Sequence, residues 1–483
     1  MGGTVSARER WLRRVRRWQL HPDAPAGGTC WVPELERAVR SRLEEIQSEK
    51  IATAAAYLFE DSPFYRRKFD EARLRPADVS SVEDLWKVPI TRKQEWADDI
   101  GANPPWGTFS PLSAGDWGRR GFMLFTSSGT TGAPRAFRHT AHDRDLWAWM
   151  WARALWAQGV RPGDVLLNCF GYGPFTAFWG AHYGMNLLGC PVISGCGVPT
   201  EQRAAYIDAY GPTVLTCTPS YALSLAESMR RMGLDPAASS IRLVVAGGEP
   251  GPCIPATKRR LERAWGATTL DVFGGAEVAM APLGYQCALD AAQREPPYAP
   301  HLMEDCYVVE VVDATTGEPV PEGRQGITVV SNLFSEAQPI LRFEMADLMQ
   351  LTSAACSCGR THRRAVGGVL AREDDLLKVR GIAVYPGAFE AAVRSVPEAG
   401  DEFEVVIDRR EGGVDEVLVR VEAGVPEADS RGLAAGVASA VQRETGLAVG
   451  CEVVAPGTLR RVEAKARRVH DRRRSGAGAS FEG

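Results

Sequence analysis

A stretch rich in hydroxyl side chains and glycine follows a short apolar run, reading MLFTSSGTTGAPRAFRHT from Met123 to Thr140. Glycine lets backbone N–H groups converge and hydroxyls add neutral donors, so a strand that runs into such a loop can cradle an anion. The loop is not a Walker motif, because GAPR stands where that motif needs Gly-Lys-Ser/Thr. A polar surface turn is the alternative interpretation. The residues that could bind phosphate are Thr126, Ser127, Ser128, Gly129, Thr130, Thr131 and Gly132.

The elements around this loop follow a regular rhythm. Residues from about Pro33 to Phe69 have apolar positions three and four apart, which predicts helix. From about residue 122 to residue 275, short apolar runs such as DVLLNCF, TVLTCTP and LVVAGGE alternate with helical segments. This alternation predicts parallel sheets flanked by helices. Ligands in such folds gather at the carboxyl ends of the strands, where AGGEP and FGGAEV also lie.

The pattern changes toward the C-terminus. Between Tyr307 and Leu351, strand-like runs separated by Gly and Pro turns predict a β-rich subdomain. After LAREDD, shorter helical and strand-like runs predict a small α+β domain. The sequence therefore predicts an α/β protein with a large N-terminal domain over residues 1–372 and a small C-terminal domain over residues 373–483.

Composition limits the classes of partner. The chain has 483 residues, too many for one compact core, and a formal net charge of -4 that gives no field for nucleic acid or an anionic membrane. It contains no apolar run of the roughly 18 to 20 residues needed to span a membrane, and its arginine-rich start lacks the apolar core of an export signal. We therefore expect a cytoplasmic protein with a small-molecule partner. Its 11 scattered cysteines predict no disulfide framework.

Together with TSSGTTGAPR, eight further segments in a fixed order resemble the adenylate-forming superfamily, which includes acyl- and aryl-CoA ligases, luciferases and peptide-synthetase adenylation domains. The resemblance is greatest to the phenylacetate-CoA ligases and covers roughly 400 residues. Besides TSSGTTGAPR, the segments are SPFYRRKFDEA, GYGPFTAFWGAHYGMNLLGCPVISG, VAGGEPG, FGGAEV, HLMED, RFEMADL, REDDLLKVRGIAVYP and TLRRVEAKARRV. Such enzymes activate a carboxylate with ATP, release pyrophosphate and pass the acyl group from AMP to a nucleophile.

The resemblance implies a role in ATP binding for several turns. The loop up to Arg135, where many relatives have lysine, would hold the β- and γ-phosphates. Glu277 would bind Mg2+ as a hard oxygen ligand, although a glutamate near a turn is by itself more often a surface acid. Asp347, which we expect to follow a strand-like run, would receive both ribose hydroxyls, and Arg372 would add a second contact. The turn Gly248, Glu249 and Pro250 would lie along adenine, with Phe273 stacking on the base and Gly274 beside it.

The small domain carries two further expectations from the resemblance. Asp374 falls at the hinge about which this domain rotates between half-reactions, with a helix-start aspartate as the alternative. Lys465 would swing in to bridge the substrate carboxylate and the α-phosphate, although a lysine in this basic tail would otherwise be a solvated charge. The sequence departs from the family at Ala276, where Ser or Thr is usual, at Ala464, where glycine is usual, and at Arg461.

A metal site is also implied. Several phenylacetate-CoA ligases carry Cys, His, Cys and Cys at the positions of Cys287, His301, Cys356 and Cys358, and the set resembles a closed structural zinc site. The Cys-x-Cys spacing is tighter than usual, so unpaired thiols are the alternative, and Cys306 is a spare ligand. The cofactors expected are therefore ATP, Mg2+, structural Zn2+ and CoA as co-substrate.

The acid substrate would enter a slot built from FGYGPFTAFWGAHYGMN. Its aromatic residues suit a flat ring, and the candidates are Tyr172, Phe178, His182 and Tyr183, although a buried helix is an equal interpretation. The leading hypothesis is an ATP-dependent ligase that turns an aromatic or arylacetic acid into its CoA thioester. Transfer to an amine, an alcohol or a carrier-protein thiol in specialised metabolism is the second, and a non-catalytic nucleotide-binding protein on the same fold is the third. The sequence leaves homodimer formation open.

Overall fold

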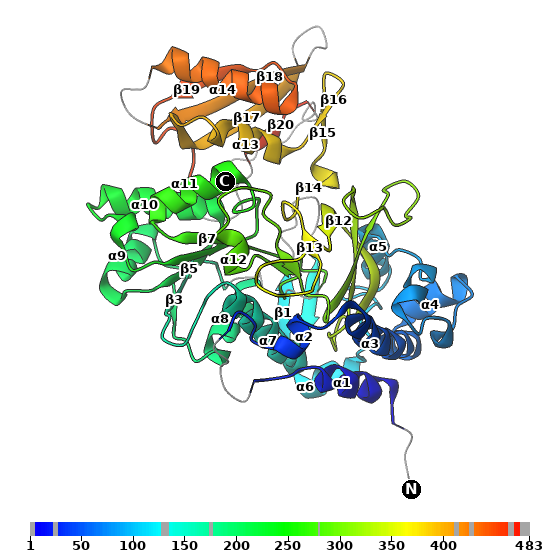
Figure 1. Cartoon of the computed structure of the whole chain (residues 1–483). Helices are drawn as coiled ribbons and strands as arrows, with labels where there is room; N and C mark the ends of the chain where they lie inside the picture. Colours follow the sequence, from blue (N-terminus) through cyan, green and yellow to red (C-terminus); the bar gives the residue numbers. More distant parts are fainter. Residues whose placement is uncertain are drawn as a thin grey trace. The chain divides into compact units, whose positions relative to one another are not determined.

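The computed structural model describes residues 5–22, 28–126, 135–172, 177–278, 281–409, 415–424, 429–461 and 468–473. The chain forms two compact units (Figure 1). The first consists of Met1–Val198, Pro212–Thr216 and Leu270–Val369, and the second of Pro199–Gly211, Cys217–Thr269 and Leu370–Gly483. The predicted division into domains 1–372 and 373–483 stays a prediction.

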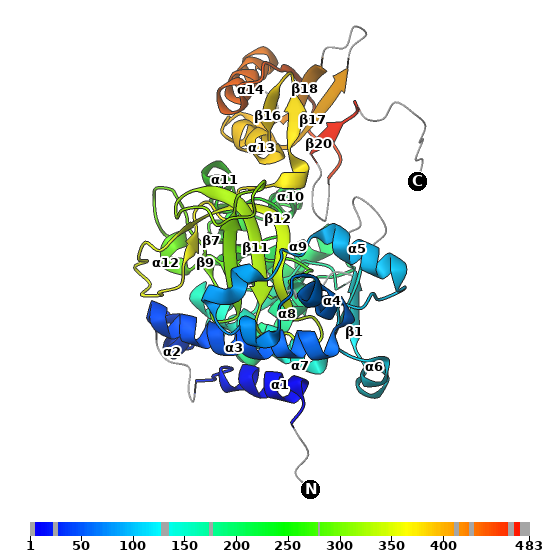
Figure 2. The ribbon, with the colours of Figure 1, turned by 90° about the vertical axis from the view of Figure 1, so that its right-hand side faces the viewer.

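Helices make up the first part of the first unit. Figure 2 shows α1 running along α3, and Trp11 of α1 is fully buried. The predicted helix between Pro33 and Phe69 is confirmed with interruptions, because Ser62 ends one helix and its side chain caps the next by accepting from Tyr65 N. The elements are α1 (Ala7–Arg17), α2 (Pro33–Glu36), α3 (Arg40–Asp61), α4 (Pro63–Glu71), η1 (Pro76–Asp78), η2 (Val82–Lys87), α5 (Lys93–Ala102) and α6 (Ala114–Arg120).

The predicted parallel strands are present in the first unit. Strand β3 (Leu166–Asn168) pairs in parallel with β4 (Val192–Ser194) and β5 (Val214–Cys217). One strand behaves differently: β1 (Met123–Thr126) pairs antiparallel with β2 (Ala136–His139) in a separate two-stranded sheet. The apolar run before the hydroxyl-rich loop is therefore one arm of a hairpin, since the chain returns directly after the loop instead of crossing over through a helix.

Two long helices follow the hairpin and pack closely. Helix α7 (Ala141–Ala157) begins at the Thr140 capping box, and α8 (Ala177–Leu187) lies against it. A Cβ atom added at Gly180 would come within 2.3 Å of the Trp151 side chain, and one at Gly184 within 2.7 Å. Glycine at these two positions, four residues apart on one face, is what lets α8 approach α7.

The antiparallel part of a larger sheet, which also includes β3, β4 and β5, completes the first unit and confirms the predicted β-rich subdomain. Its strands neighbour one another in the order β10, β11, β12, β13, β9, β8, β7. The elements are β7 (Thr268–Phe273), β8 (Gly284–Tyr285), α12 (Ala288–Ala291), β9 (His301–Leu302), β10 (Tyr307–Val312), β11 (Gln325–Asn332), β12 (Ile340–Thr352) and β13 (Arg364–Ala365).

The second unit contains α9 (Thr200–Tyr210), α10 (Pro219–Arg231), η3 (Pro236–Ala238), β6 (Leu243–Ala246) and α11 (Pro255–Trp265). Its later part is the predicted small α+β domain. There the sheet order is β19, β18, β17, β20, and α13 and α14 share one core with it that includes Phe389, Val393 and Val437. The elements are β14 (Ala371–Arg372), η4 (Glu373–Asp375), β15 (Leu377–Val379), β16 (Ile382–Val384), α13 (Pro386–Arg394), β17 (Ala399–Arg409), β18 (Asp415–Ala423), α14 (Ser430–Thr445), β19 (Gly450–Val454) and β20 (Val469–Asp471).

The mixed α/β fold predicted from the sequence is thus confirmed. In the described part of the chain, no helix combines the length and the apolar character that crossing a membrane requires.

Candidate functional site

The hairpin β1–β2 carries the two ends of the predicted phosphate loop. Thr126 is the last residue of β1, it pairs with Ala136, and Arg135 directly precedes β2. The loop residues Ser127, Ser128, Gly129, Thr130, Thr131 and Gly132 lie outside the described residues. The hairpin nevertheless fixes where the loop begins and ends, because both arms are hydrogen-bonded.

The turn after β7 carries Glu277, and its carboxylate faces the hairpin. Arg135 Nη1 lies 3.8 Å from Glu277 Oε1, too long for a hydrogen bond but close enough for Coulomb attraction. The Glu277 side chain keeps 15% of its surface exposed. A cation and an accessible carboxylate therefore meet beside the end of the hydroxyl-rich loop, and the carboxylate oxygens suit Mg2+.

Glycines shape the chain on both sides of that turn. A Cβ at Gly274 would lie 2.7 Å from Ala281 O, and one at Gly284 would lie 2.2 Å from the ring of Phe273. Phe273 keeps part of its surface exposed, and Ala276 sits in the turn just before Glu277. Close backbone approach thus fixes the ring of Phe273 over β8, where Gly284 leaves room for it.

Asp347 lies inside β12, which corrects the expectation that it follows a strand. Leu348 pairs with Ile327 and Glu344 with Val329, so the residues between Glu344 and Leu348 lie opposite the single residue Thr328. Ala346 adopts a φ of 61° within this bulge. A bulge re-aims the side chains that it carries, and Asp347 is 9% exposed at this point.

In the second unit, the turn after β6 holds Gly248, Glu249 and Pro250. Gly248 has a φ of +87°, a conformation that glycine adopts without strain. Glu249 Oε1 accepts from Ser220 N at 2.7 Å, which places a carboxylate at the N-terminus of α10. Arg372, in β14, is half-exposed, and Asp374 lies in the short helix η4 with its side chain outside the described part.

Lys465 and Ala464 lie outside the described residues, but the residues that flank them do not. Arg461 Nη2 lies 3.1 Å from Glu227 of α10, and its Nη1 lies 2.6 Å from Glu422. Arg468 Nη2 donates to Ser220 Oγ at 3.3 Å. Both flanks of residues 462–467 thus contact α10, the helix whose N-terminus Glu249 caps. The sequence singled out Arg461 as an unusual residue and gave no sign of these partners.

The predicted acid slot contains a linked aromatic group on and before α8. Tyr172 Oη and His182 Nδ1 lie 2.9 Å apart, and Trp179 Nε1 donates to Tyr172 O at 3.2 Å. Burial raises the pKa of Tyr172 and lowers that of His182. The Tyr183 ring is 5.6 Å from that of His182, and the side chain of Phe178 lies outside the described part. The alternative interpretation is confirmed in that α8 is a helix. The use of this aromatic group as the acid slot stays a prediction.

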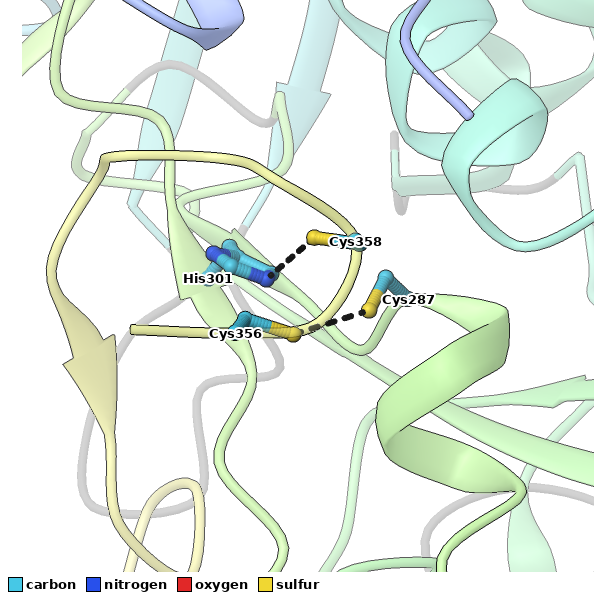
Figure 3. Close-up of side chains that lie close together, drawn as sticks. All are labelled: Cys287, His301, Cys356 and Cys358. Atoms are coloured by element: carbon cyan, nitrogen blue, oxygen red, sulfur yellow. Dashed lines mark hydrogen bonds between the residues drawn. The ribbon is translucent and has the colours of Figure 1, made fainter. Parts of the chain in front are cut away.

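The four predicted zinc ligands come together (Figure 3). Cys287 precedes α12, His301 begins β9, and Cys356 and Cys358 lie in the loop after β12. Their ligand atoms all lie within 4.8 Å of one another and every residue is buried. Cys287 Sγ is 3.8 Å from Cys356 Sγ, and Cys358 Sγ is 3.3 Å from His301 Nε2. Three sulfurs and one imidazole this close form a set that suits tetrahedral zinc.

The surroundings of the cluster favour thiolate on one sulfur. Hydrogen bonds from Cys287 and Cys356 lower the pKa of Cys358, whereas the hydrogen bonds of Cys287 with Cys356 and Cys358, together with burial, raise the pKa of Cys287. Backbone N–H groups also face the sulfurs, from Asp290 to Cys287 at 3.4 Å and from Arg360 to Cys358 at 3.5 Å. Cys306 takes no part, since its thiol lies 3.4 Å from Asp305 Oδ2.

The sequence did not indicate that the N-terminal segment holds the cysteine loop. Thr29 Oγ1 donates to Cys358 O at 2.9 Å, and Arg360 Nη2 donates to Thr29 O at 2.6 Å. Arg360 also pairs with the fully buried Glu36 at 2.6 Å. The burial of Glu36 explains why Arg360 lies here, because a buried charge needs a partner.

A second buried network joins the hairpin to the segment after β11. Asp143 Oδ1 accepts from Ser335 Oγ at 2.9 Å and from Glu336 N at 2.7 Å. Thr140 Oγ1, at the end of β2, donates to Glu336 Oε2 at 2.7 Å, and Arg8 of α1 pairs with the same carboxylate. Sequence reasoning missed this network, which ties the end of the hairpin at Thr140 to Glu336.

Comparisons with known proteins identify the family of the chain. Residues 44–333 match the AMP-binding enzyme family and residues 381–473 match the AMP-binding enzyme C-terminal domain. A phenylacetate-coenzyme A ligase from Thermus thermophilus is 36% identical over 460 residues, covering 92% of this chain and 99% of that protein. One from Pseudomonas putida is 33% identical, covering 91% and 96%.

Solved structures agree as well. A crystal structure of 2-hydroxyisobutyryl-CoA ligase, in the postadenylation state in complex with 2-HIB-AMP, superposes with a TM-score of 0.87 at 29% identity and covers 96% of both chains. The same ligase in complex with 2-HIB-AMP and CoA, in the thioesterification state, gives a TM-score of 0.70. The resemblance inferred from the motifs is confirmed, and the chain belongs to the AMP-binding enzyme family, with phenylacetate-coenzyme A ligases among its relatives.

Proposed function

We propose that this protein is an AMP-forming ligase that activates an aromatic or arylacetic carboxylic acid with ATP and transfers the acyl group to CoA. The observation that carries the site assignment is the meeting of Arg135 and Glu277 at 3.8 Å beside the hydroxyl-rich loop. The reaction is supported by relatives named phenylacetate-coenzyme A ligase, which this chain matches over nearly their full length.

The chain's own residues would divide the work on ATP. The loop from Thr126 to Arg135 would hold the β- and γ-phosphates with its amides, hydroxyls and guanidinium, because these donors offset phosphate charge. Glu277 would hold Mg2+, which when bound neutralises the phosphates. The remaining contacts to nucleotide would come from Phe273, Gly274, Asp347 and Arg372, and from the turn Gly248, Glu249 and Pro250.

Lys465 would complete the adenylation site. Its ammonium would stabilise charge between the substrate carboxylate and the α-phosphate. The contacts of the flanking Arg461 and Arg468 with α10 support this role, since Ser220 in the first turn of α10 also donates its N–H to the carboxylate of Glu249 in the proposed adenine turn. Rotation about Asp374 would then remove Lys465 for the second half-reaction.

The acid would bind against the group made of Tyr172, Phe178, His182 and Tyr183. The half-buried aromatic rings suit a flat aryl group, and the Tyr172–His182 hydrogen bond fixes the orientation of both side chains. We infer a structural role for zinc at Cys287, His301, Cys356 and Cys358, because four buried ligands leave no open position for catalysis.

The test is a pyrophosphate-release assay on benzoates, phenylacetates, cinnamates and aminobenzoates, with and without CoA. We expect pyrophosphate release with at least one aryl acid and a thioester only when CoA is present. Release without any use of CoA would instead support transfer to an amine, an alcohol or a carrier protein in specialised metabolism. ATP binding with no pyrophosphate exchange for any acid would support a non-catalytic protein.

A further inference from the structure

Gln338 is a buried amide that the proposed mechanism does not use. It lies two residues before β12 and is 2% exposed. Its Nε2 donates to the backbone oxygen of Glu277 at 2.7 Å. Because a carbonyl oxygen only accepts, the amide nitrogen must face it, which fixes the orientation of the side chain.

The acceptor belongs to a tight turn. Val278 N donates to Gly275 O at 3.2 Å, which closes the turn around Ala276 and Glu277. Tyr307 Oη donates to Val278 O at 3.3 Å and holds the far side. The bond from Gln338 fixes the peptide plane that follows Glu277, and with it the direction of the Glu277 side chain toward Arg135.

Gln338 is itself held rigidly. Its backbone N–H donates to Ser335 Oγ at 2.9 Å, and its backbone oxygen accepts from Asn332 Nδ2 at 2.8 Å. Ser335 Oγ in turn donates to Asp143 Oδ1 at the start of α7. A continuous series of buried hydrogen bonds therefore runs from α7 through Gln338 to the turn of Glu277.

We propose that Gln338 is a positioning residue that orients Glu277 for binding magnesium with ATP. The proposal rests on the proposed function, in which Glu277 holds Mg2+. The Glu277 carboxylate keeps 15% of its surface exposed, and among the described residues its ion-pair partner is Arg135 at 3.8 Å, too far for a hydrogen bond that would fix it. Its backbone must supply the orientation, and Gln338 is the side chain that holds that backbone at the Glu277 carbonyl.

The test is calorimetric binding of ATP to the full chain in Mg2+ and in EDTA. Gln338→Leu removes the amide donor and puts an apolar side chain in its place. We expect it to reduce the gain in ATP affinity that Mg2+ provides by about fivefold to tenfold, while affinity in EDTA changes less than twofold. Ser110→Ala is the matched control, because Ser110 Oγ donates at 2.8 Å to the neighbouring carbonyl of Ala337 and not to Glu277.

Two further variants keep the test decisive. Gln338→Glu keeps the size of the side chain and cannot donate when ionised. It should show the same reduced gain in ATP affinity from Mg2+, and it replaces Gln338→Leu if that variant unfolds at a lower temperature. If Glu277→Gln loses the Mg2+ gain while both Gln338 variants keep it, the inference is overturned and the proposed role of Glu277 stands. If Glu277→Gln also keeps the gain, the role of Glu277 fails, and this inference fails with it.

Discussion

The cysteine cluster and the turn of Glu277 are built in opposite ways. All four cluster residues are buried, and backbone amides and the N-terminal segment hold them from several sides. Glu277 keeps part of its side chain exposed, and in the described part of the chain it faces Arg135 at 3.8 Å and is held by a hydrogen bond to its backbone oxygen. A closed set of ligands suits a metal that stays, and an open carboxylate suits one that arrives and leaves with a nucleotide.

This difference separates stability from activity. Loss of a group in the cluster should unfold the protein, and loss of Glu277 should leave it folded and inactive. Four substitutions, given from the largest expected effect to the smallest, measure stability and activity in the cluster, at Glu277 and in the elements beside them.

Cys358→Ser should have the largest effect, because it removes one of four ligands and leaves three buried groups without a metal to bridge them. We expect zinc content to fall close to zero and the free energy of unfolding to fall by about 4 kcal/mol or more. Elemental analysis and denaturant titration measure the two. Cys451→Ser is the control, since that half-buried thiol lies in β19 outside the cluster. If native protein contained no zinc, the cysteine cluster would not be a metal site.

Glu277→Gln should act on chemistry alone. Loss of the metal-binding carboxylate should slow pyrophosphate exchange by about 100-fold to 1000-fold, while the free energy of unfolding changes by less than about 0.5 kcal/mol. Glu318→Gln, at an exposed position, is the isosteric control and should match the wild type. A large loss of stability in Glu277→Gln would contradict the separation of the two regions.

His139→Phe tests the pH dependence of the hairpin support. His139 is fully buried beside Trp147, and burial lowers its pKa to about 4 from 6.5. The unfolded chain therefore binds more protons than the folded one between these values, and stability falls as pH drops through this window. We expect the wild type to lose about 2 kcal/mol more than His139→Phe between pH 7.5 and pH 5. Denaturant titrations at both pH values measure the free energy of unfolding of each protein. If the wild type and His139→Phe lost the same free energy of unfolding between the two pH values, the titration of His139 would not contribute to stability.

Tyr172→Phe should have the smallest effect. It removes the hydrogen bond to His182 and keeps the ring, so kcat/KM for the acid should fall by about fivefold with KM for ATP unchanged. Steady-state kinetics with the best acid of the panel provide the measurement. An equal change in KM for ATP would place Tyr172 outside the acid slot.

Local patterns in the sequence were sufficient for much of the fold, and the resemblance to the phenylacetate-CoA ligases implied the cysteine set. Apolar periodicity located most helices and strands, and the four residues expected to bind zinc lie together in the structure. The hairpin pairing of β1 was missed, because alternation of strand and helix does not show which neighbour a strand takes. Asp347 was misplaced relative to its strand, since a bulge leaves no mark in apolar spacing.

The supporting contacts could not be predicted because they join distant parts of the chain. Gln338 and Glu277 are 61 residues apart, and Thr29 and Cys358 are 329 apart. Nothing in the types of these residues identifies the partner, since an amide or a hydroxyl can pair with any backbone group. Only the folded arrangement shows which carbonyl each of them meets.

The glycine pair of α8 limits how the acid slot can change. Any side chain at Gly180 or Gly184 would overlap Trp151 and push the helix away from its neighbour. Attempts to redirect the enzyme toward other acids by directed evolution should therefore find productive substitutions at the outward positions of α8 and none on the face that carries the glycines.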